Sequence, residues 1–345
     1  YPLIDGVVNG CPSHLLEPSR LQKIQYSEDF SQGYWGEVNT TFTDNETTSP
    51  SGLLTGKLTR NVTTFSCIRD VTISTTLGST YVFSAFYKKD TETTINHSVL
   101  NENTGYVTFN FDTETISITR NDNGNTIETD GFGFEKYENG WYRVYLKFVR
   151  KAGSIQLQVA RQDSSVIGQS TFIYGAMLEQ GSYPTSYIPN YGTSAGITRS
   201  AETATGAGDA STFNDSEGVL MAEVSALTNS GGKWISLSNG STSQRISFAN
   251  ENGNIRVYIF NGVVIWDYIY YNINTITSNK ISLKYKSGDY SLFINGFKIN
   301  TSTSSLVASG IDSLQFNSGG GSGNFEGNTK QIQYFDSALN DSDLE

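Results

Sequence analysis

The chain has 345 residues, and its 23 basic and 34 acidic side chains give a formal net charge of −11. No basic cluster interrupts this acidic background, which argues against a nucleic-acid surface or a surface for anionic membranes. No apolar run approaches the roughly 20 residues that a membrane-spanning helix needs, so no membrane insertion is expected. The length suits two domains. Aromatic residues make up 12% of the chain and accompany abundant Asn, Thr, Ser and Gly, a composition typical of β-sandwiches.

Residues 1–20 carry turn signals and prolines and are expected to form a connector to a part of the protein that precedes this fragment. From Leu21 onward, short alternating segments predict a series of strands separated by turns. The predicted strands are residues 53–60, 68–75, 80–88, 94–100, 106–111, 115–120, 141–149, 154–161 and 170–178.

Two Asn-Gly pairs in this half have the left-handed geometry that tight turns require. Asn123-Gly124 predicts a hairpin, and Asn139-Gly140 introduces the strand 141–149. Alternation in that strand places Trp141 near the edge of the face opposite the core. The predicted core face consists of Tyr142, Val144, Leu146 and Phe148.

The stretch 174–192 starts as a strand and ends in a segment that contains two prolines. Pro184 and Pro189 lack the N–H that a central strand needs, so we expect a domain boundary here and a rigid strut that presents the next domain. Residues 191–213 are small, polar and rich in glycine, and they are predicted to be a linker.

Strands resume after Asn214, with Asn-Gly turns between several of them and no helical period of useful length. The predicted strands are 218–226, 233–238, 244–250, 254–260, 263–270, 280–286, 289–294, 297–301, 311–316 and 329–335. The fold class is therefore all-β, with two tandem antiparallel β-sandwiches. The expected boundaries are a connector at 1–20, a first domain at 21–190, a linker at 191–213 and a second domain at 214–345.

Several motifs in the first half resemble a module found in bacteriophage tail-fibre and other virion surface proteins. They are Tyr26-Ser-Glu-Asp-Phe30, Asn139-Gly-Trp-Tyr-Arg-Val144, Tyr174-Gly-Ala-Met-Leu-Glu-Gln-Gly181, Thr185-Ser-Tyr-Ile-Pro189 and the junction Arg199-Ser-Ala-Glu202. The module is similar to the jelly-roll carbohydrate-binding modules of the family 4/9 type. The resemblance covers roughly residues 11–202.

The second half resembles the concanavalin A-like, laminin-G-like sandwich. Two stretches carry this resemblance: the strand, turn and strand of Lys280–Gly296, and the closing strand Gln331–Leu339. Together the two resemblances imply a protein of the virion surface that attaches to bacterial surface polysaccharide. They also imply other virion proteins as partners and a homo-oligomer, with a trimer favoured. The alternative is a structural or decoration protein whose sandwiches make assembly contacts only.

Catalysis is poorly supported, and the chain is expected not to be an enzyme. His14 and His97 are the two histidines, and neither belongs to a nucleophile elbow or a metal-ligand pair. Glu128-Thr-Asp130 is the nearest match to a glucanase carboxylate strand, but Gly133 stands at its third position. A depolymerase remains a third alternative, because glycoside hydrolysis needs only two carboxylates. Cys11 and Cys67 are expected as thiols rather than as a disulfide, and Ser318–Gly323 as a flexible loop.

Sugar binding requires aromatic faces that pack on pyranose rings, with polar side chains around them. The candidates are Tyr34 and Trp35 in one loop, and Trp266, Tyr268 and Tyr270 on one face of 263–271. A core position is an equal alternative for Trp35 and Trp266, and it is the expected position for Trp141 and Trp234. A structural calcium ion is the one cofactor considered, with weak candidate ligands. These ligands are Glu179, Asp209, Asp215 and Glu217.

Overall fold

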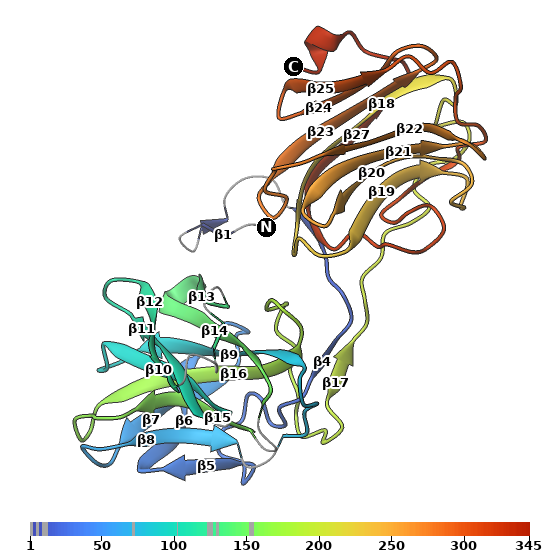
Figure 1. The fold of residues 1–345 in the computed structure, drawn as a ribbon. Helices are drawn as coiled ribbons and strands as arrows, with labels where there is room; N and C mark the ends of the chain where they lie inside the picture. Colours follow the sequence, from blue (N-terminus) through green and yellow to red (C-terminus); the bar gives the residue numbers. More distant parts are fainter. Residues whose placement is uncertain are drawn as a thin grey trace. The chain divides into compact units, whose positions relative to one another are not determined.

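The computed structural model describes residues 13–70, 73–101, 103–122, 127–128, 131–151 and 155–345, with the strand backbones β1 (Leu3–Ile4) and β2 (Val7–Val8). This part of the chain is almost entirely β, with two short 3-10 turns at Glu138–Gly140 and Asp341–Asp343 and no α-helix. It therefore contains no helix that could cross a membrane. Two compact units are present: one is Ser19–Ser200 with the strands β1 and β2, and the other is Ala201–Glu345 with residues 13–18. The predicted all-β fold of two tandem sandwiches is confirmed (Figure 1).

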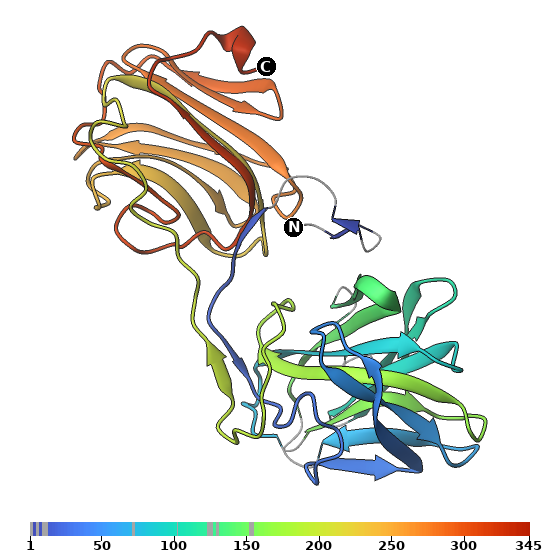
Figure 2. The ribbon, with the colours of Figure 1, turned by 180° about the vertical axis from the view of Figure 1, so that it is seen from behind.

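The N-terminal unit is built from two antiparallel sheets that face each other (Figures 1 and 2). One sheet has the order β12-β11-β10-β15-β8-β5, and the other β13-β14-β9-β16-β7-β6. Consecutive strands such as β14, β15 and β16 alternate between the sheets, as in a jelly roll. The first sheet comprises β5 (Trp35–Val38), β8 (Ser66–Asp70), β10 (Thr94–Asn101), β11 (Asn103–Asn110), β12 (Thr115–Asn121) and β15 (Ile155–Gln162). The second comprises β6 (Thr40–Thr48), β7 (Leu54–Arg60), β9 (Thr80–Lys89), β13 (Phe132–Lys136), β14 (Trp141–Val149) and β16 (Ser170–Gln180).

Strand β14 shows how alternation builds this core. Its residues Tyr142 to Phe148 contribute every second side chain to the buried cluster between the sheets, as predicted. Trp141 points to the opposite face, where it is 1% exposed because Phe86 and Tyr174 pack around it. Its indole N–H donates to the Thr48 carbonyl at 3.0 Å. The second sheet is therefore covered on both faces.

The proline-rich stretch 184–190 forms part of that outer cover. The Tyr187 ring lies 5.6 Å from the Phe86 ring and 5.8 Å from the Tyr174 ring, and its hydroxyl is 2.6 Å from the Ser27 hydroxyl. Ile188 and Asn190 are buried against the same unit. We expected a strut that leads to the next domain. The structure instead fixes this stretch to the N-terminal sandwich.

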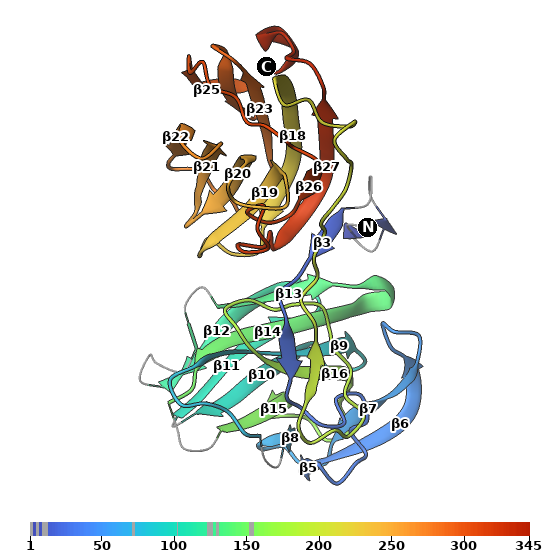
Figure 3. The ribbon, with the colours of Figure 1, turned by 90° about the vertical axis from the view of Figure 1, so that its right-hand side faces the viewer.

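The C-terminal unit is a second antiparallel sandwich (Figure 3). Its sheets have the orders β25-β24-β23-β18-β27-β3 and β22-β21-β20-β19-β26. The first comprises β3 (His14–Leu16), β18 (Glu217–Ala226), β23 (Asn279–Lys286), β24 (Tyr290–Ile294), β25 (Phe297–Ser302) and β27 (Gly327–Phe335). The second comprises β19 (Gly232–Ser238), β20 (Arg245–Glu251), β21 (Asn254–Phe260), β22 (Val264–Tyr270) and β26 (Ser313–Gln315).

Two segments that were expected to be irregular form short strands. Residues 14–16 lie in the predicted connector, yet as β3 they pair with β27, and Leu16 is 2% exposed in the C-terminal core. Residues 197–199 lie in the predicted linker, and as β17 (Ile197–Arg199) they pair with β4 (Arg20–Gln22) within the N-terminal unit (Figure 1). The chain therefore enters and leaves the N-terminal unit along paired strands. The predicted hairpin at Asn123-Gly124 lies outside the described residues.

Candidate functional site

The predicted aromatic pair of the first domain belongs to the core. Trp35 is 5% exposed, its ring lies 4.7 Å from the Phe30 ring, and its indole N–H donates to the Tyr26 carbonyl at 3.0 Å. The Tyr34 ring meets Trp35 edge-on at 5.3 Å, and the Tyr34 hydroxyl is buried. Burial raises the pKa of Tyr34. Trp35 is therefore a core residue, which corrects this part of the expected site, and Tyr34 is partly buried against the same core.

The three candidate aromatic residues of 263–271, Trp266, Tyr268 and Tyr270, also point inward. Ile265 and Trp266 are both buried because the pairing of β22 with β21 shifts register there, so the strict alternation assumed from sequence is broken. Beyond the shift, Tyr268 and Tyr270 pack against the same core. The face predicted to present aromatic rings to a ligand is therefore the core face.

The four predicted calcium ligands hold the fold together instead of gathering around an ion. Glu179 is buried and accepts bonds from the N–H and hydroxyl of Thr185 at 2.8 and 2.7 Å, and burial raises its pKa. Asp209 and Asp215 accept backbone N–H groups, and Glu217 lies 2.9 Å from the ammonium of Lys286. Among the described His, Cys, Asp and Glu side chains, no three form a group that could hold a metal ion.

A different surface unites aromatic and charged side chains, on the outer side of the five-stranded sheet of the C-terminal unit. In β19, Ile235 and Leu237 belong to the core, so alternation turns Trp234 outward. The same argument turns Arg245 of β20 outward, together with Arg256, Tyr258 and Phe260 of β21 and Asp267 of β22. We call the set the arginine–aromatic face: Trp234, Arg245, Arg256, Tyr258, Phe260 and Asp267.

The rings and guanidinium groups of this face lie against one another. The Arg245 Cζ lies 4.7 Å from the Tyr258 ring centroid and 5.1 Å from that of Trp234. For the Arg256 Cζ the same distances are 5.1 and 5.9 Å. The Phe260 ring stacks on Tyr258 at 5.9 Å with an interplanar angle of 17°. Cation–π contacts of this kind hold both arginines in place.

Arg256 is neutralised within the face. Its Nε and Nη2 donate to the two oxygens of Asp267 at 2.9 and 2.8 Å, and its Nη1 donates to Glu251 at 2.8 Å. These bonds raise the pKa of Arg256. The pair with Asp267 also fixes a carboxylate beside the aromatic rings, where it can accept hydrogen bonds.

The glycine-rich stretch Ser318–Gly323 borders this face. The Gly323 carbonyl accepts a bond from the Trp234 N–H at 2.9 Å, and a Cβ at Gly323 would lie 2.6 Å from Trp234 Cδ1. Gly323 also has a φ of 62°, a conformation that side chains with a Cβ rarely adopt. The expected flexible loop is therefore a close-fitting turn, and glycine is required where it touches the indole.

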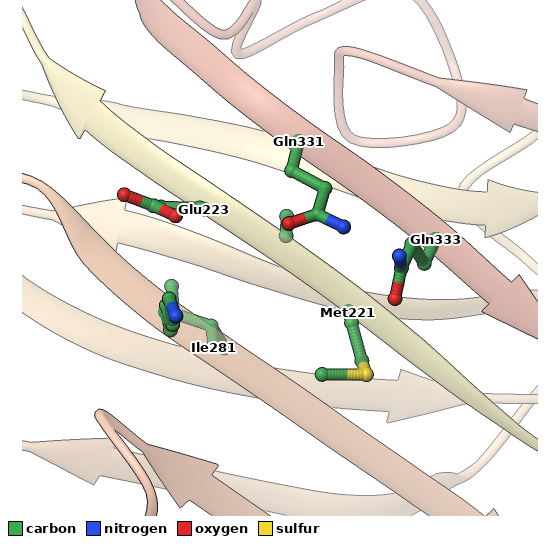
Figure 4. A pocket seen from close by; sticks show the side chains of 7 residues that line it. Met221, Glu223, Ile281, Gln331 and Gln333 are labelled. Carbon is green, nitrogen blue, oxygen red and sulfur yellow. The ribbon is translucent and has the colours of Figure 1, made fainter. Parts of the chain in front are cut away.

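The opposite sheet of the C-terminal unit has a shallow hollow of about 80 Å³ (Figure 4). Met221, Gln331 and Gln333 line it together with Glu223, whose carboxylate lies 2.9 Å from the ammonium of Lys330. No aromatic ring lines the hollow. The arginine–aromatic face has the better chemistry for a sugar, because aromatic planes pack on C–H groups while guanidinium and carboxylate groups bond hydroxyls.

Comparisons with known proteins concern the fold alone. No protein-family model matches the sequence, and no curated protein matches it. The chain is similar to the CBM40 domain of the Ruminococcus gnavus IT-sialidase bound to α2,3-sialyllactose, with a TM-score of 0.34 and 18% identity over 41% of this chain and 94% of that one. It is also similar to mouse laminin α1 domains LG4-5, with a TM-score of 0.30 and 8% identity over 99% and 96% of the two chains. Similarities this low say nothing about what the chain binds.

Proposed function

We propose that the chain is a glycan-binding protein and that the arginine–aromatic face is its contact surface. The observation that carries the proposal is the grouping of Tyr258 and Phe260 with two ordered arginines and a fixed carboxylate on one open sheet. Such a surface matches the two sides of a sugar, the C–H patches of the ring and the hydroxyls at its rim. The side chains of the face are held before a ligand arrives, which lowers the entropy cost of binding.

We further propose that the protein acts on a virion surface, where it attaches to bacterial surface polysaccharide as a homo-oligomer and without enzymatic activity. The motifs in residues 11–202 and 280–339 that resemble phage and lectin-like modules support this part. Release of reducing ends from a bound polysaccharide would contradict the non-enzymatic role.

The test is binding of the purified protein to an array of bacterial capsular and O-antigen polysaccharides. The wild-type chain should bind at least one of them, and Tyr258→Ala and Phe260→Ala should each weaken that binding by about tenfold or more, the equivalent of ~1.4 kcal/mol. Trp141→Phe is the matched control, because Trp141 is buried on the N-terminal unit. Binding to no polysaccharide, or binding that neither face variant changes, would contradict the proposal.

A second candidate function is contact with another protein of an assembly. Val263, Val264 and Leu306 are 54%, 53% and 45% exposed, and the Asn261 side chain holds the two segments together by donating to the Val307 carbonyl at 2.8 Å. Adjacent exposed apolar side chains favour a protein contact. If they form the oligomer interface, Val264→Asp should lower the mass measured by light scattering, and an unchanged mass would contradict this role.

A further inference from the structure

Arg245 differs from the other arginine of the face in its partners. Its Nη1 donates to the Ser318 carbonyl at 2.8 Å, and its second polar partner is the hydroxyl of Tyr258. Both partners are neutral. Among the residues that the structure describes, no carboxylate lies within 4.0 Å of its guanidinium nitrogens, whereas Arg256 contacts two.

Three other arginines of the chain, all buried, do meet a carboxylate. In the N-terminal unit, Arg60 lies 2.7 Å from Glu92, and Arg143 lies 3.6 Å from Glu135. Arg161 offers the nearest comparison, because it also lies against two rings, at 4.7 and 5.2 Å, yet Asp163 neutralises it at 2.5 Å. Although the chain has a net charge of −11, the partly buried Arg245 differs from these three arginines in having no carboxylate partner among the described residues.

The surroundings of Arg245 increase its attraction for an anion. The aromatic rings and the turn at Ser318 remove water from one side of the guanidinium, and its buried Nε has no hydrogen-bond partner. Partial desolvation lowers the local dielectric constant and strengthens the pull on an opposite charge. Arginine stays charged at any physiological pH, and its hydrogen bonds to an ionised carboxylate or sulfate are stronger than those between neutral groups.

The face is also polarised. Arg256, Glu251 and Asp267 together carry one excess negative charge at one side, and Arg245 carries one positive charge at the other. A neutral glycan would leave the positive charge without a partner. A glycan with one acidic substituent next to hydroxyl groups would match both sides.

We propose that the arginine–aromatic face takes an acidic glycan, with a carboxylate or sulfate group on Arg245, the sugar ring against Tyr258 and hydroxyls toward Asp267. The inference rests on the proposed function and names the chemical class of the ligand. Because the chain as a whole is acidic, nonspecific attraction of polyanions is disfavoured, and a preference for them has to come from a local site.

The test compares two matched pairs of polymers at physiological ionic strength: polygalacturonate with its methyl ester, and dextran sulfate with dextran. The first pair tests a carboxylate and the second a sulfate. The full chain should bind one acidic polymer at least about tenfold more tightly than its neutral counterpart. Arg245→Gln should remove that preference, and Arg245→Lys should keep part of it because it keeps the charge. Arg161→Gln is the control and should change nothing, because Asp163 already neutralises Arg161 in the native protein.

Each outcome separates the two hypotheses. Equal binding of acidic and neutral polymers, or an equal loss in Arg245→Gln and Arg161→Gln, would overturn the acidic-glycan inference and leave glycan binding intact. Binding of none of the four polymers, together with no binding on the polysaccharide array, would overturn both.

An NMR measurement on the wild-type chain tests the inference even if Arg245→Gln does not fold. The chain has 4 tryptophans and thus few indole N–H signals in a nitrogen-correlated NMR spectrum. Sodium glucuronate should shift the Trp234 signal and leave those of Trp35 and Trp141 unchanged, because their indoles donate to backbone carbonyls inside the other unit. Glucose at the same concentration should shift none of them. An equal shift with glucose, or none with glucuronate or sodium sulfate, would contradict the inference.

Discussion

Asp70 and His97 are predicted to have opposite effects on how the free energy of unfolding of the N-terminal sandwich depends on pH. Asp70 is 2% exposed; its Oδ1 accepts the Leu157 N–H, and its Oδ2 has no partner. Burial raises the pKa of Asp70 to about 7. The folded state therefore binds a proton between pH 7 and the unfolded value of 3.8, where the unfolded state does not. Lowering the pH through this window raises the free energy of unfolding.

His97 acts in the reverse direction. Its ring stacks on Phe83 at 4.0 Å, its Nδ1 lies 2.7 Å from the Tyr87 hydroxyl, and its Nε2 donates to the Phe83 carbonyl at 3.1 Å. Burial lowers the pKa of His97 to about 3, from 6.5 in the unfolded chain. Below pH 6.5 the unfolded state binds the additional proton, so the free energy of unfolding falls as the pH falls.

The two contributions have similar size. A pKa difference changes stability by about 1.36 kcal/mol for each pH unit within its window. Between pH 6.5 and 4.5, Asp70 therefore adds about 2.7 kcal/mol and His97 removes about 2.7 kcal/mol. Asp70→Asn abolishes the first contribution and preserves the shape of the side chain. We expect this variant to lose about 2–3 kcal/mol more than the wild type over that interval.

The assay is urea unfolding at pH 6.5 and 4.5, followed by hydrogen exchange and mass spectrometry of peptides from β9 and β14, which report on this unit alone. Comparing wild type with Asp70→Asn cancels every other titrating group. Asp112→Asn removes an exposed carboxylate and should keep the wild-type behaviour. If wild type and Asp70→Asn respond equally to pH, then Asp70 does not carry a raised pKa and the reasoning fails.

Three further predictions follow from contacts described above or in the same units. Glu92→Gln should destabilise the N-terminal unit by about 3–5 kcal/mol in urea unfolding, because it leaves the fully buried Arg60 without its bidentate partner at 2.7 and 2.8 Å. Asp122→Asn, beside the exposed Arg120, is the control and should leave the unfolding midpoint unchanged. Equal effects of the two substitutions would contradict the argument. Gly323→Ala should weaken glycan binding by about tenfold, because its Cβ would clash with Trp234. Gly321→Ala is the control and should retain binding, because Gly321 also has a positive φ but has open space at its Cβ. Equal losses would show that backbone strain is responsible and the clash with Trp234 is not. Leu16→Ala should destabilise the C-terminal unit by about 2–4 kcal/mol, because Leu16 is buried in its core. The loss is measured by hydrogen exchange as lower protection of peptides from β18 and β23. Lower protection of peptides from β9 instead would mean that Leu16 belongs to the N-terminal unit.

Strands with clear alternation and Asn-Gly turns are recovered from sequence nearly to the residue. Predicted strands 141–149 and 254–260 coincide with β14 and β21. Strand β6 was missed, because its sequence Thr-Thr-Phe-Thr-Asp-Asn-Glu-Thr-Thr is exposed along most of its length and has no apolar period. Strand β3 was missed because three residues are too few for a period and its partner β27 lies at the far end of the chain. Local patterns carry no information on such distant pairs.

The candidate site was missed for a related reason. Trp234 was expected to be buried and is 9% exposed. The phase of Lys-Trp-Ile-Ser-Leu-Ser nevertheless places it on the outer side of the sheet, where Arg245 and Arg256 lie over its ring. For Trp266 the alternation correctly places it on one face with Tyr268 and Tyr270, but it does not tell which face is the core, and the register shift at Ile265 buries that residue as well. The contacts of Arg245 depend on β19, β20 and β21 being adjacent, and no single segment of sequence reveals that arrangement.

The pairing of β3 with β27 sets an order on the folding of this protein. Ser13 and Asn328 are 315 positions apart, yet their side chains are 3.4 Å apart. During synthesis, β3 emerges first and has no partner until β27 is made, so the C-terminal sandwich closes late. Ser19–Ser200 of the N-terminal unit form one continuous stretch that can fold earlier, and the pair β4–β17 then brings together two positions that enclose more than half of the chain between β3 and β27. The entropy cost of closing a loop grows with its length. Earlier folding of the N-terminal unit therefore lowers the entropy cost of pairing β3 with β27 in the C-terminal unit.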